Sequence, residues 1–460
     1  MLDSTAKFTP PVPVPRAEPL GLIALLRTLK NNPLEAWTQA HFEQPVVMGG
    51  LSIGRVAVVS DPGAIRRVLL ENCANYQKDW MQRRILSAGL ANGLLSAEGS
   101  QWKAQRRALA PLFSRKTVLA FSAAMVDSAQ ALVERLARQQ DRTVDVAVEA
   151  TRTTLDVLER TIFSDGFGRG AEEIRVAMKS YFDTIGQIDP FDLLGLPAVV
   201  PRPGRWRLRP TLRLFEDAID TVIATRRRQI AENKPDVPRD ILTLLLEARD
   251  PETGAALSET EIRANVLTFI AAGQETTANC ITWSLYLLSQ SPEWRQRIRA
   301  EADREFGDGK ADVADRLVET RALIEETNRL YPPLAAISRA ALGPDDLAGV
   351  RISRGTMVVI APYVLHRHRA LWTKPDVFDP NRFLDGAREK IDRYAYLPFG
   401  AGPRICIGAT FAIQEATIVL AAIMRNLDLE LAPGHAVWPV LKVTLRPKGG
   451  LPMIVRRRVR

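Results

Sequence analysis

The sequence predicts a mainly helical fold with a minor β portion, on three observations. From about Gln101 to Leu330, apolar residues recur at the spacing of one helix face. After Leu330 the chain changes to short β-like pieces, such as Val350–Ile352 and Met357–Ala361, joined by loops. The composition, 46% hydrophobic and 25% charged, is that of a globular protein whose core can bury a bulky cofactor.

The N-terminal elements are predicted from local signals. Residues 1–20 are rich in proline, which predicts an extended segment, and Leu20–Leu29 predicts an amphipathic helix. Gln44–Ser60 alternates apolar and small residues around glycines, which indicates a short hairpin. An aspartate and a proline then supply a helix cap and a first turn, so we expect a helix over Gly63–Glu71.

A long helix is predicted in the second half of the chain. Ser258 and Glu261 form a capping box, and the helix should run to about Gln290, a length of ~32 residues or ~48 Å. It is apolar on most faces, so it should cross the interior. Before it, the proline-rich stretch Asp189–Pro210 predicts a long connection. At the end of the chain, Val443–Val455 predicts β structure.

Composition and cysteine content limit the classes of protein. No run of ~18 apolar residues is present to span a bilayer, and no signal peptide precedes the prolines, so we expect no membrane anchor. Three scattered cysteines form neither a disulfide framework nor a zinc pattern, which favours the reducing cytoplasm. No repeat or linker divides the sequence, so residues 1–460 are expected to form a single domain.

The chain is basic, with a formal net charge of +9 and arginines close to its C-terminus. Two interpretations remain open: a solvated basic surface, or a docking face for an acidic protein. Nucleic acid is disfavoured, because no basic stretch is interleaved with aromatic residues.

A glycine-rich loop carries the strongest chemical signal, F-x-x-G-x-R-x-C-x-G, with Cys406 as its cysteine. Gly402 and Gly408 would allow unusual φ values and let the backbone approach a flat macrocycle. A helix starting just after Cys406 would direct its positive end at a thiolate. Arg404 can reach a carboxylate such as a heme propionate, and Phe399 would exclude water from the sulfur.

This loop resembles the heme-binding signature of the cytochrome P450 family. The resemblance implies a triangular, helix-rich fold that buries noncovalent heme b between the long central helix and the cysteine loop. It also implies that the Cys406 thiolate is the axial iron ligand and favours O–O cleavage.

The middle of the long helix carries a second motif, Ala271–Thr277. Gly273 would let a planar ligand touch the backbone, and Thr276 could bend the helix by bonding a carbonyl one turn back. The resemblance adds Ala272 as a cofactor contact. It also implies that Glu275 and Thr276 are the acid–alcohol pair that relays protons to dioxygen on the iron.

A third motif is structural. Glu326 and Arg329 lie at i and i+3 on one helix face. The resemblance is to the E-x-x-R helix of the family, where this pair is buried and completed by a second arginine, here Arg382. Asn381 departs from the glutamate of many relatives. This triad is expected to fix the loop that carries Cys406.

Further residues match positions that hold the cofactor in the family. Trp102 and Arg106 fall on one helix face and could bind a propionate through the indole N–H and the guanidinium. Arg339 matches a second propionate arginine. His366 also fits a recurrent family segment, with a hydrogen-bonded structural histidine as the alternative explanation.

The resemblance implies a monooxygenase that inserts one atom of O2 into a lipophilic small molecule by hydroxylation, or by epoxidation or dealkylation. We expect no fused reductase. Electrons would come one at a time from a separate ferredoxin with its reductase or from a flavodoxin, and ultimately from NAD(P)H. We expect a monomer.

Two alternatives remain open, a peroxide-driven hydroxylase or isomerase and a heme sensor or carrier. The substrate side should include Tyr76–Leu95, Tyr181–Val200 and the apolar Leu334–Ile337. A positive patch for the electron donor is predicted to project to solvent from or just after the Trp102 helix. It comprises Lys103, Arg107, Arg115 and Lys116.

Overall fold

The computed structural model describes residues 8–458 except 52–53, 81, 84–91, 165–202 and 307–311. The chain folds into two compact units, which are described separately. The first unit comprises Met1–Asp79, Met125–Thr153 and Thr276–Arg460. The second unit comprises Trp80–Ala124 and Thr154–Glu275.

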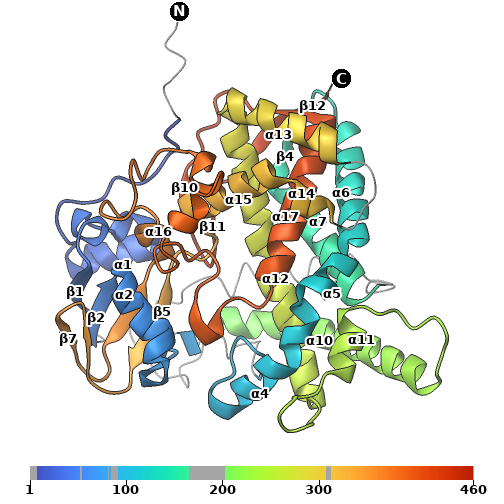
Figure 1. Ribbon diagram of the computed structural model, residues 1–460, viewed down its shortest axis with the longest axis horizontal. Helices are drawn as coiled ribbons and strands as arrows, with labels where there is room; N and C mark the ends of the chain where they lie inside the picture. The colour runs from blue at the N-terminus through green and yellow to red at the C-terminus, as the bar shows by residue number, and fades with distance from the viewer. Residues whose placement is uncertain are drawn as a thin grey trace, which may run out of the picture. The chain divides into compact units, whose positions relative to one another are not determined.

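The main sheet belongs to the first unit and has the strand order β1-β2-β8-β5-β3. Its strands are β1 (Val46–Leu51), β2 (Gly54–Val59), β8 (Met357–Ile360), β5 (Ile337–Ala341) and β3 (Tyr76–Gln77). β2 and β8 pair in parallel and the other neighbours are antiparallel. The predicted hairpin over Gln44–Ser60 is confirmed, and its strands lie beside α2 in the blue part of Figure 1.

The helix after this hairpin starts as the sequence indicates. Asp61 accepts a hydrogen bond from the backbone N–H of Ala64, and α2 spans Pro62–Arg66. The chain then continues as a π-helix over Arg67–Glu71. Before the sheet, the predicted amphipathic helix is α1 (Leu22–Asn31). The proline-rich segment is held to the first unit, because the Tyr331 hydroxyl donates to the carbonyl oxygen of Pro11 at 2.8 Å.

Several helices also belong to the first unit. α13 (Pro292–Glu305), α15 (Val318–Leu330) and α17 (Ala409–Asn426) pack on one another, as Figure 1 shows. The buried carboxylate of Glu301 on α13 accepts the backbone N–H groups of Glu319 and Thr320, which satisfies the first turn of α15. Short helices are α14 (Val313–Arg316) and α16 (Pro362–Leu365).

The β structure predicted over Val443–Val455 is present, as strands β11 (Leu445–Pro447) and β12 (Pro452–Arg457). A three-stranded sheet has the order β4-β12-β9, with β4 (Thr143–Asp145) and β9 (Leu427–Leu431) beside β12. Two small hairpins pair β6 (Asp345–Leu347) with β7 (Val350–Ile352), and β10 (Pro439–Leu441) with β11. Trp283 on the long helix donates its indole N–H to the carbonyl oxygen of Leu445 at 3.1 Å, which anchors β11.

The second unit is helical. Among the described residues, its complete helices are α4 (Gly99–Leu109), α5 (Arg115–Ala120), α10 (Pro203–Ala231) and α11 (Ile241–Glu247). Parts of α6 (Ser122–Ala137) and α7 (Val146–Ile162) also belong to it. Arg226 is 3% exposed and pairs with Asp240, which joins α10 to the start of α11. The predicted connection Asp189–Pro210 is wrong at its end, because α10 begins at Pro203. The rest of that stretch lies outside the described residues.

The long helix is α12 (Glu259–Ser289), 31 residues. Its capping box is present: Ser258 N–H donates to Glu261, and Glu261 N–H donates to the Ser258 hydroxyl. Most residues from Ile262 to Leu288 are buried, so the helix crosses the interior as predicted. The boundary between the two units falls within it, at Thr276.

Candidate active site

The cysteine loop presents one accessible thiol in the first unit. Cys406 is exposed, whereas Cys73 is half-buried and Cys280 is buried. Burial raises the pKa of the Cys280 thiol to about 12, which keeps it protonated. Backbone bonds close the loop, from Cys406 N–H to the Phe399 carbonyl at 2.9 Å and from Ile405 N–H to the Gly402 carbonyl at 3.1 Å. Of the three cysteines, Cys406 is therefore suited to ligate a metal held outside the loop.

Gly402 is required by packing inside the protein. Its φ is +71°, and an added Cβ would lie 1.9 Å from the carbonyl oxygen of Leu69, in the π-helix that follows α2. The unusual φ expected from the sequence is present, but the close approach is to the chain itself. Gly408 has φ −88° and an open Cβ direction, so the expectation of a special φ there was wrong. The other loop residues, Phe399 and Arg404, are half-buried.

The E-x-x-R pair is fully buried, with both side chains 0% exposed. Arg329 Nε lies 2.7 Å from one Glu326 oxygen and Nη2 lies 2.8 Å from the other, a bidentate pair. Arg329 also donates to the backbone carbonyls of His366, Pro375 and Val377. Its five N–H donors are thus all used, which explains how this charge can be buried.

Arg382 approaches the same carboxylate without a hydrogen bond. Its Nε lies 3.7 Å from Glu326 Oε1, and among the described residues this Nε has no hydrogen-bond partner. The Nη2 group donates instead to the Lys374 carbonyl at 2.9 Å. The backbone N–H of Asp379 takes the place beside Glu326 Oε1, at 2.8 Å. Arg382 therefore contributes positive charge to the triad. Through its bond to Lys374 it also holds the loop that precedes it in the chain.

His366 connects this triad to the cysteine loop. It is fully buried, and its Nε2 accepts the backbone N–H of Leu397 at 2.8 Å. Burial, with the charges of Arg329 and Arg367, lowers its pKa to about 3, so the ring is neutral. The sequence left its role open, and its contacts are those of a structural histidine. A histidine directly after the apolar run Tyr363–Leu365 was the available signal.

The Ala271–Thr277 stretch interrupts the buried face of α12. Ala272 is exposed, and Gly273, Glu275 and Thr276 are half-buried. An added Cβ on Gly273 would meet the Leu158 side chain at 3.1 Å. The missing side chain thus makes room for Leu158 of α7, and the contact of Gly273 with a planar ligand stays a prediction. The exposed position is Ala272.

Helix α4 in the second unit carries Trp102 and Arg106, both half-buried and four residues apart. Arg107 was expected to project freely to solvent, and this was wrong. It forms a bidentate pair with Asp250, at 2.7 Å for both bonds, and a further pair with Glu252 at 3.1 Å. Lys103, Arg115 and Lys116 are exposed.

The structure places the predicted residues in two groups. The first unit holds the cysteine loop, the triad, Thr276 and Arg339, and the last donates to the Ser338 carbonyl at 2.7 Å. The second unit holds Trp102, Arg106, Ala272, Gly273 and Glu275. Of the apolar segment expected to line the substrate side, Leu334 and Ala336 are exposed. Tyr181–Val200 and part of Tyr76–Leu95 lie outside the described residues.

The residues present fit a heme. An accessible thiol lies two residues before the N-cap of α17, where the helix directs its partial positive charge. The α12 motif offers an exposed alanine within a buried helix, a place where a flat ring can contact the chain. No helix among the described residues is both long and apolar enough to cross a membrane.

Comparisons with known proteins agree with a heme site built around a cysteine thiol. The family model described as Cytochrome P450 matches residues 10–453. Two relatives come from Streptomyces melanosporofaciens. Cyclooctatin synthase is 32% identical over 94% of this chain and 92% of its own. Cyclooctat-9-en-7-ol 5-monooxygenase is 31% identical over 95% of this chain and 94% of its own. The crystal structure of the cytochrome P450DA heme domain covers 98% of both chains at 26% identity, with a TM-score of 0.85.

Proposed function

The chain belongs to the cytochrome P450 family and is a heme-dependent monooxygenase that uses O2, and we propose that it oxygenates a lipophilic small molecule with electrons from a separate protein. The observation that carries the proposal is the exposed Cys406 thiol in its F-x-x-G-x-R-x-C-x-G loop. The bound heme iron would supply the activation of dioxygen.

We propose that the Cys406 thiolate would hold the heme iron. The thiol is accessible, and the bond from its own N–H to Phe399 holds the loop closed around it. Electron donation from the sulfur would be tuned by nearby backbone N–H groups and by the start of α17. Arg404 and Arg339 in the first unit, with Trp102 and Arg106 in the second, are proposed to bind the propionates through charge-assisted hydrogen bonds.

Proton delivery is proposed for two adjacent residues of α12. Glu275 can exchange a proton with solvent because it is only half-buried, and Thr276 can donate and accept through one hydroxyl. Ala272 lies one turn before Thr276 and is exposed, so the surface of α12 is accessible next to the Thr276 hydroxyl. The presence of both residues favours the dioxygen-dependent reaction over the peroxide-driven alternative.

The substrate class is inferred from apolar surface. Leu334 and Ala336 are exposed on the segment before β5, and Ala272 is exposed on α12. Apolar side chains accessible beside a cofactor site favour a lipophilic ligand. The relative named Cyclooctat-9-en-7-ol 5-monooxygenase supports an alicyclic alcohol or alkene as the first compounds to try.

The electron source is proposed to be a ferredoxin with its reductase, or a flavodoxin, supplied in turn by NAD(P)H. Support comes from the net charge of +9 and the exposed Lys103 and Lys116, which suit a small acidic carrier. We further propose one catalytic domain acting as a monomer. A content of three cysteines is consistent with the cytoplasm as its location.

Two measurements test this function. The reduced, carbon monoxide-bound protein should have a strongly red-shifted Soret band, which Cys406→Ser should abolish while Cys73→Ser and Cys280→Ser retain it. Loss of the band in Cys280→Ser instead would refute the ligand assignment. A panel of alicyclic alkenes and alcohols should change the heme spin state and yield oxygenated products with a surrogate reductase. A purely polar set of ligands would contradict the substrate class.

A further inference from the structure

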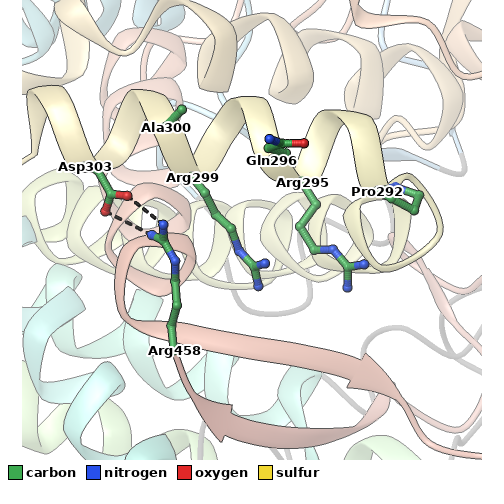
Figure 2. A pocket seen from close by; sticks show the side chains of 7 residues that line it. All are labelled: Pro292, Arg295, Gln296, Arg299, Ala300, Asp303 and Arg458. Carbon is green, nitrogen blue, oxygen red and sulfur yellow. Dashed lines mark hydrogen bonds and ion pairs between the residues drawn. The ribbon is translucent and has the colours of Figure 1, made fainter. Parts of the chain in front are cut away.

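A cavity of about 470 Å³ lies along α13, in the first unit and apart from the residues assigned to the oxygenase reaction. It is lined by Pro292, Arg295, Gln296, Arg299, Ala300, Asp303 and Arg458. Figure 2 shows Arg295 and Arg299 projecting from α13 in the same direction, with Arg458 reaching up from the C-terminal strand. Three guanidinium groups in one cavity suggest an anionic ligand.

The charges at this cavity do not cancel. Arg458 is neutralised by Asp303, to which it donates two hydrogen bonds of 2.9 and 2.6 Å, the dashed lines of Figure 2. Arg299 Nη2 lies 2.6 Å from Asp428 Oδ1. Arg295 lies 3.8 Å from the same Asp428 oxygen. Among the described residues, these three arginines therefore share two carboxylates, which leaves an excess of positive charge.

The same arginines have unused hydrogen-bond donors. Within the part of the chain that the structure describes, Arg295 donates no side-chain hydrogen bond, and Arg299 Nε is buried without a partner. Their side chains are 23% and 20% exposed. A buried donor of a charged group is costly to leave unpaired, so a ligand that accepts from Arg299 Nε would be bound favourably. The same ligand can accept from the partly exposed guanidinium of Arg295.

The N-terminus of α13 adds positive electrostatic potential to the cavity, near Pro292 and Arg295. α13 is 14 residues long, and its N-cap residue Ser291 makes no side-chain capping bond. Pro292 and Arg295 lie in its first turn, where the helix dipole places partial positive charge. Arg295 and Arg299 are four residues apart, on one face, so their planar donor groups can act on one ligand.

We propose that this cavity binds a compact oxyanion, a phosphate or carboxylate group, between Arg295 and Arg299. The anion would accept hydrogen bonds from both guanidinium groups and neutralise the charge that Asp428 leaves uncompensated. The remaining lining, Gln296 and Ala300, leaves space for a small body attached to that group.

Titration of the heme-loaded protein with inorganic phosphate at low ionic strength tests the site, by calorimetry or ³¹P NMR. Saturable binding at one site is expected, weakened by at least about tenfold in Arg295→Gln, the loss of one charged hydrogen-bonding partner. Arg304→Gln is the matched control, because Arg304 lies on the same helix, is 63% exposed and pairs with Glu305. It should bind phosphate like the unaltered protein.

A parallel titration with citrate distinguishes a carboxylate from a phosphate ligand, and tighter binding of either identifies the preferred group. The carbon monoxide spectrum and the melting temperature verify that each variant is folded. Arg295→Gln should fold, because Arg299 retains its own contact with Asp428. No saturable binding of either anion, or equal losses in Arg295→Gln and Arg304→Gln, would overturn the proposal.

Discussion

The Nε2 atom of His366 accepts a hydrogen bond from the backbone N–H of Leu397, 2.8 Å away. Leu397 lies just before the loop that carries Cys406. The carbonyl of His366 is in turn held by Arg329, whose charge is balanced by Glu326. A continuous set of buried contacts thus runs from α15 to Leu397, and Phe399 then closes the loop on Cys406. The position of the thiol depends on groups that never touch it.

This arrangement predicts a pH dependence of stability from His366. Its pKa falls from 6.5 to about 3 on folding, so the unfolded chain binds the extra proton between these values. Stability due to the neutral ring is fully present above pH 6.5 and is lost as pH falls toward 3, by about 1.4 kcal/mol per pH unit at most.

Urea unfolding at pH 7, 6 and 5 measures this slope. His366→Gln removes the titrating ring and keeps an acceptor for Leu397 N–H, so stability should fall less between pH 7 and 5. His435→Gln leaves His366 in place and should retain the slope of the unaltered protein. Equal slopes in all three proteins would show that His366 is not the group responsible.

Gly402→Ala should destabilise the protein through two effects. The left-handed φ of +71° costs an alanine about 1 kcal/mol, and the new Cβ would also collide with the Leu69 carbonyl oxygen. Gly400→Ala is the matched control, with the same φ but only Ile337 Cδ1 nearby, at 3.5 Å. The difference in free energy of unfolding between the two variants isolates the collision. Similar losses would mean that the backbone at Leu69 moves away freely.

Glu326→Ala should cost on the order of 3–5 kcal/mol, because it leaves the fully buried Arg329 without its counter-charge. We expect protein that is insoluble or fails to retain heme. Glu319→Ala is the control on the same helix, since its pair with Arg297 is about one-third exposed and should be worth less than about 1 kcal/mol. Soluble, heme-replete Glu326→Ala with unchanged melting temperature would contradict the role assigned to the triad.

The sequence alone predicted the features that depend on near neighbours. The capping box of Ser258 and Glu261 placed the start of α12, and Asp61 placed the start of α2. Alternation around two glycines indicated the first hairpin. These signals are local because a cap or a turn is made by residues within three or four positions of one another.

Contacts between distant segments could not be predicted in the same way. Gly402 meets Leu69, Gly273 meets Leu158, and Arg107 pairs with Asp250, each more than 100 positions away in the chain. A glycine or an arginine in a motif suggests that close approach or pairing occurs, but the partner is set by tertiary packing. The motifs therefore proposed a candidate site without naming the chain partners of Gly402 and Gly273, and they were wrong on the free projection of Arg107.

Thr276 is proposed to take part in proton delivery. Thr276→Val replaces the hydroxyl with a methyl group of similar size and should leave heme and substrate binding nearly unchanged. Without the hydroxyl, proton delivery to reduced oxygen is impaired. Electrons should therefore be recovered as hydrogen peroxide, and product per NAD(P)H should fall several-fold. Thr277→Val is the matched control, because this neighbouring hydroxyl is buried and makes no hydrogen bond with any described residue. Both variants are assayed with one surrogate reductase, counting NAD(P)H, peroxide and product together. If Thr276→Val converted electrons to product as well as Thr277→Val does, Thr276 would have no part in proton delivery.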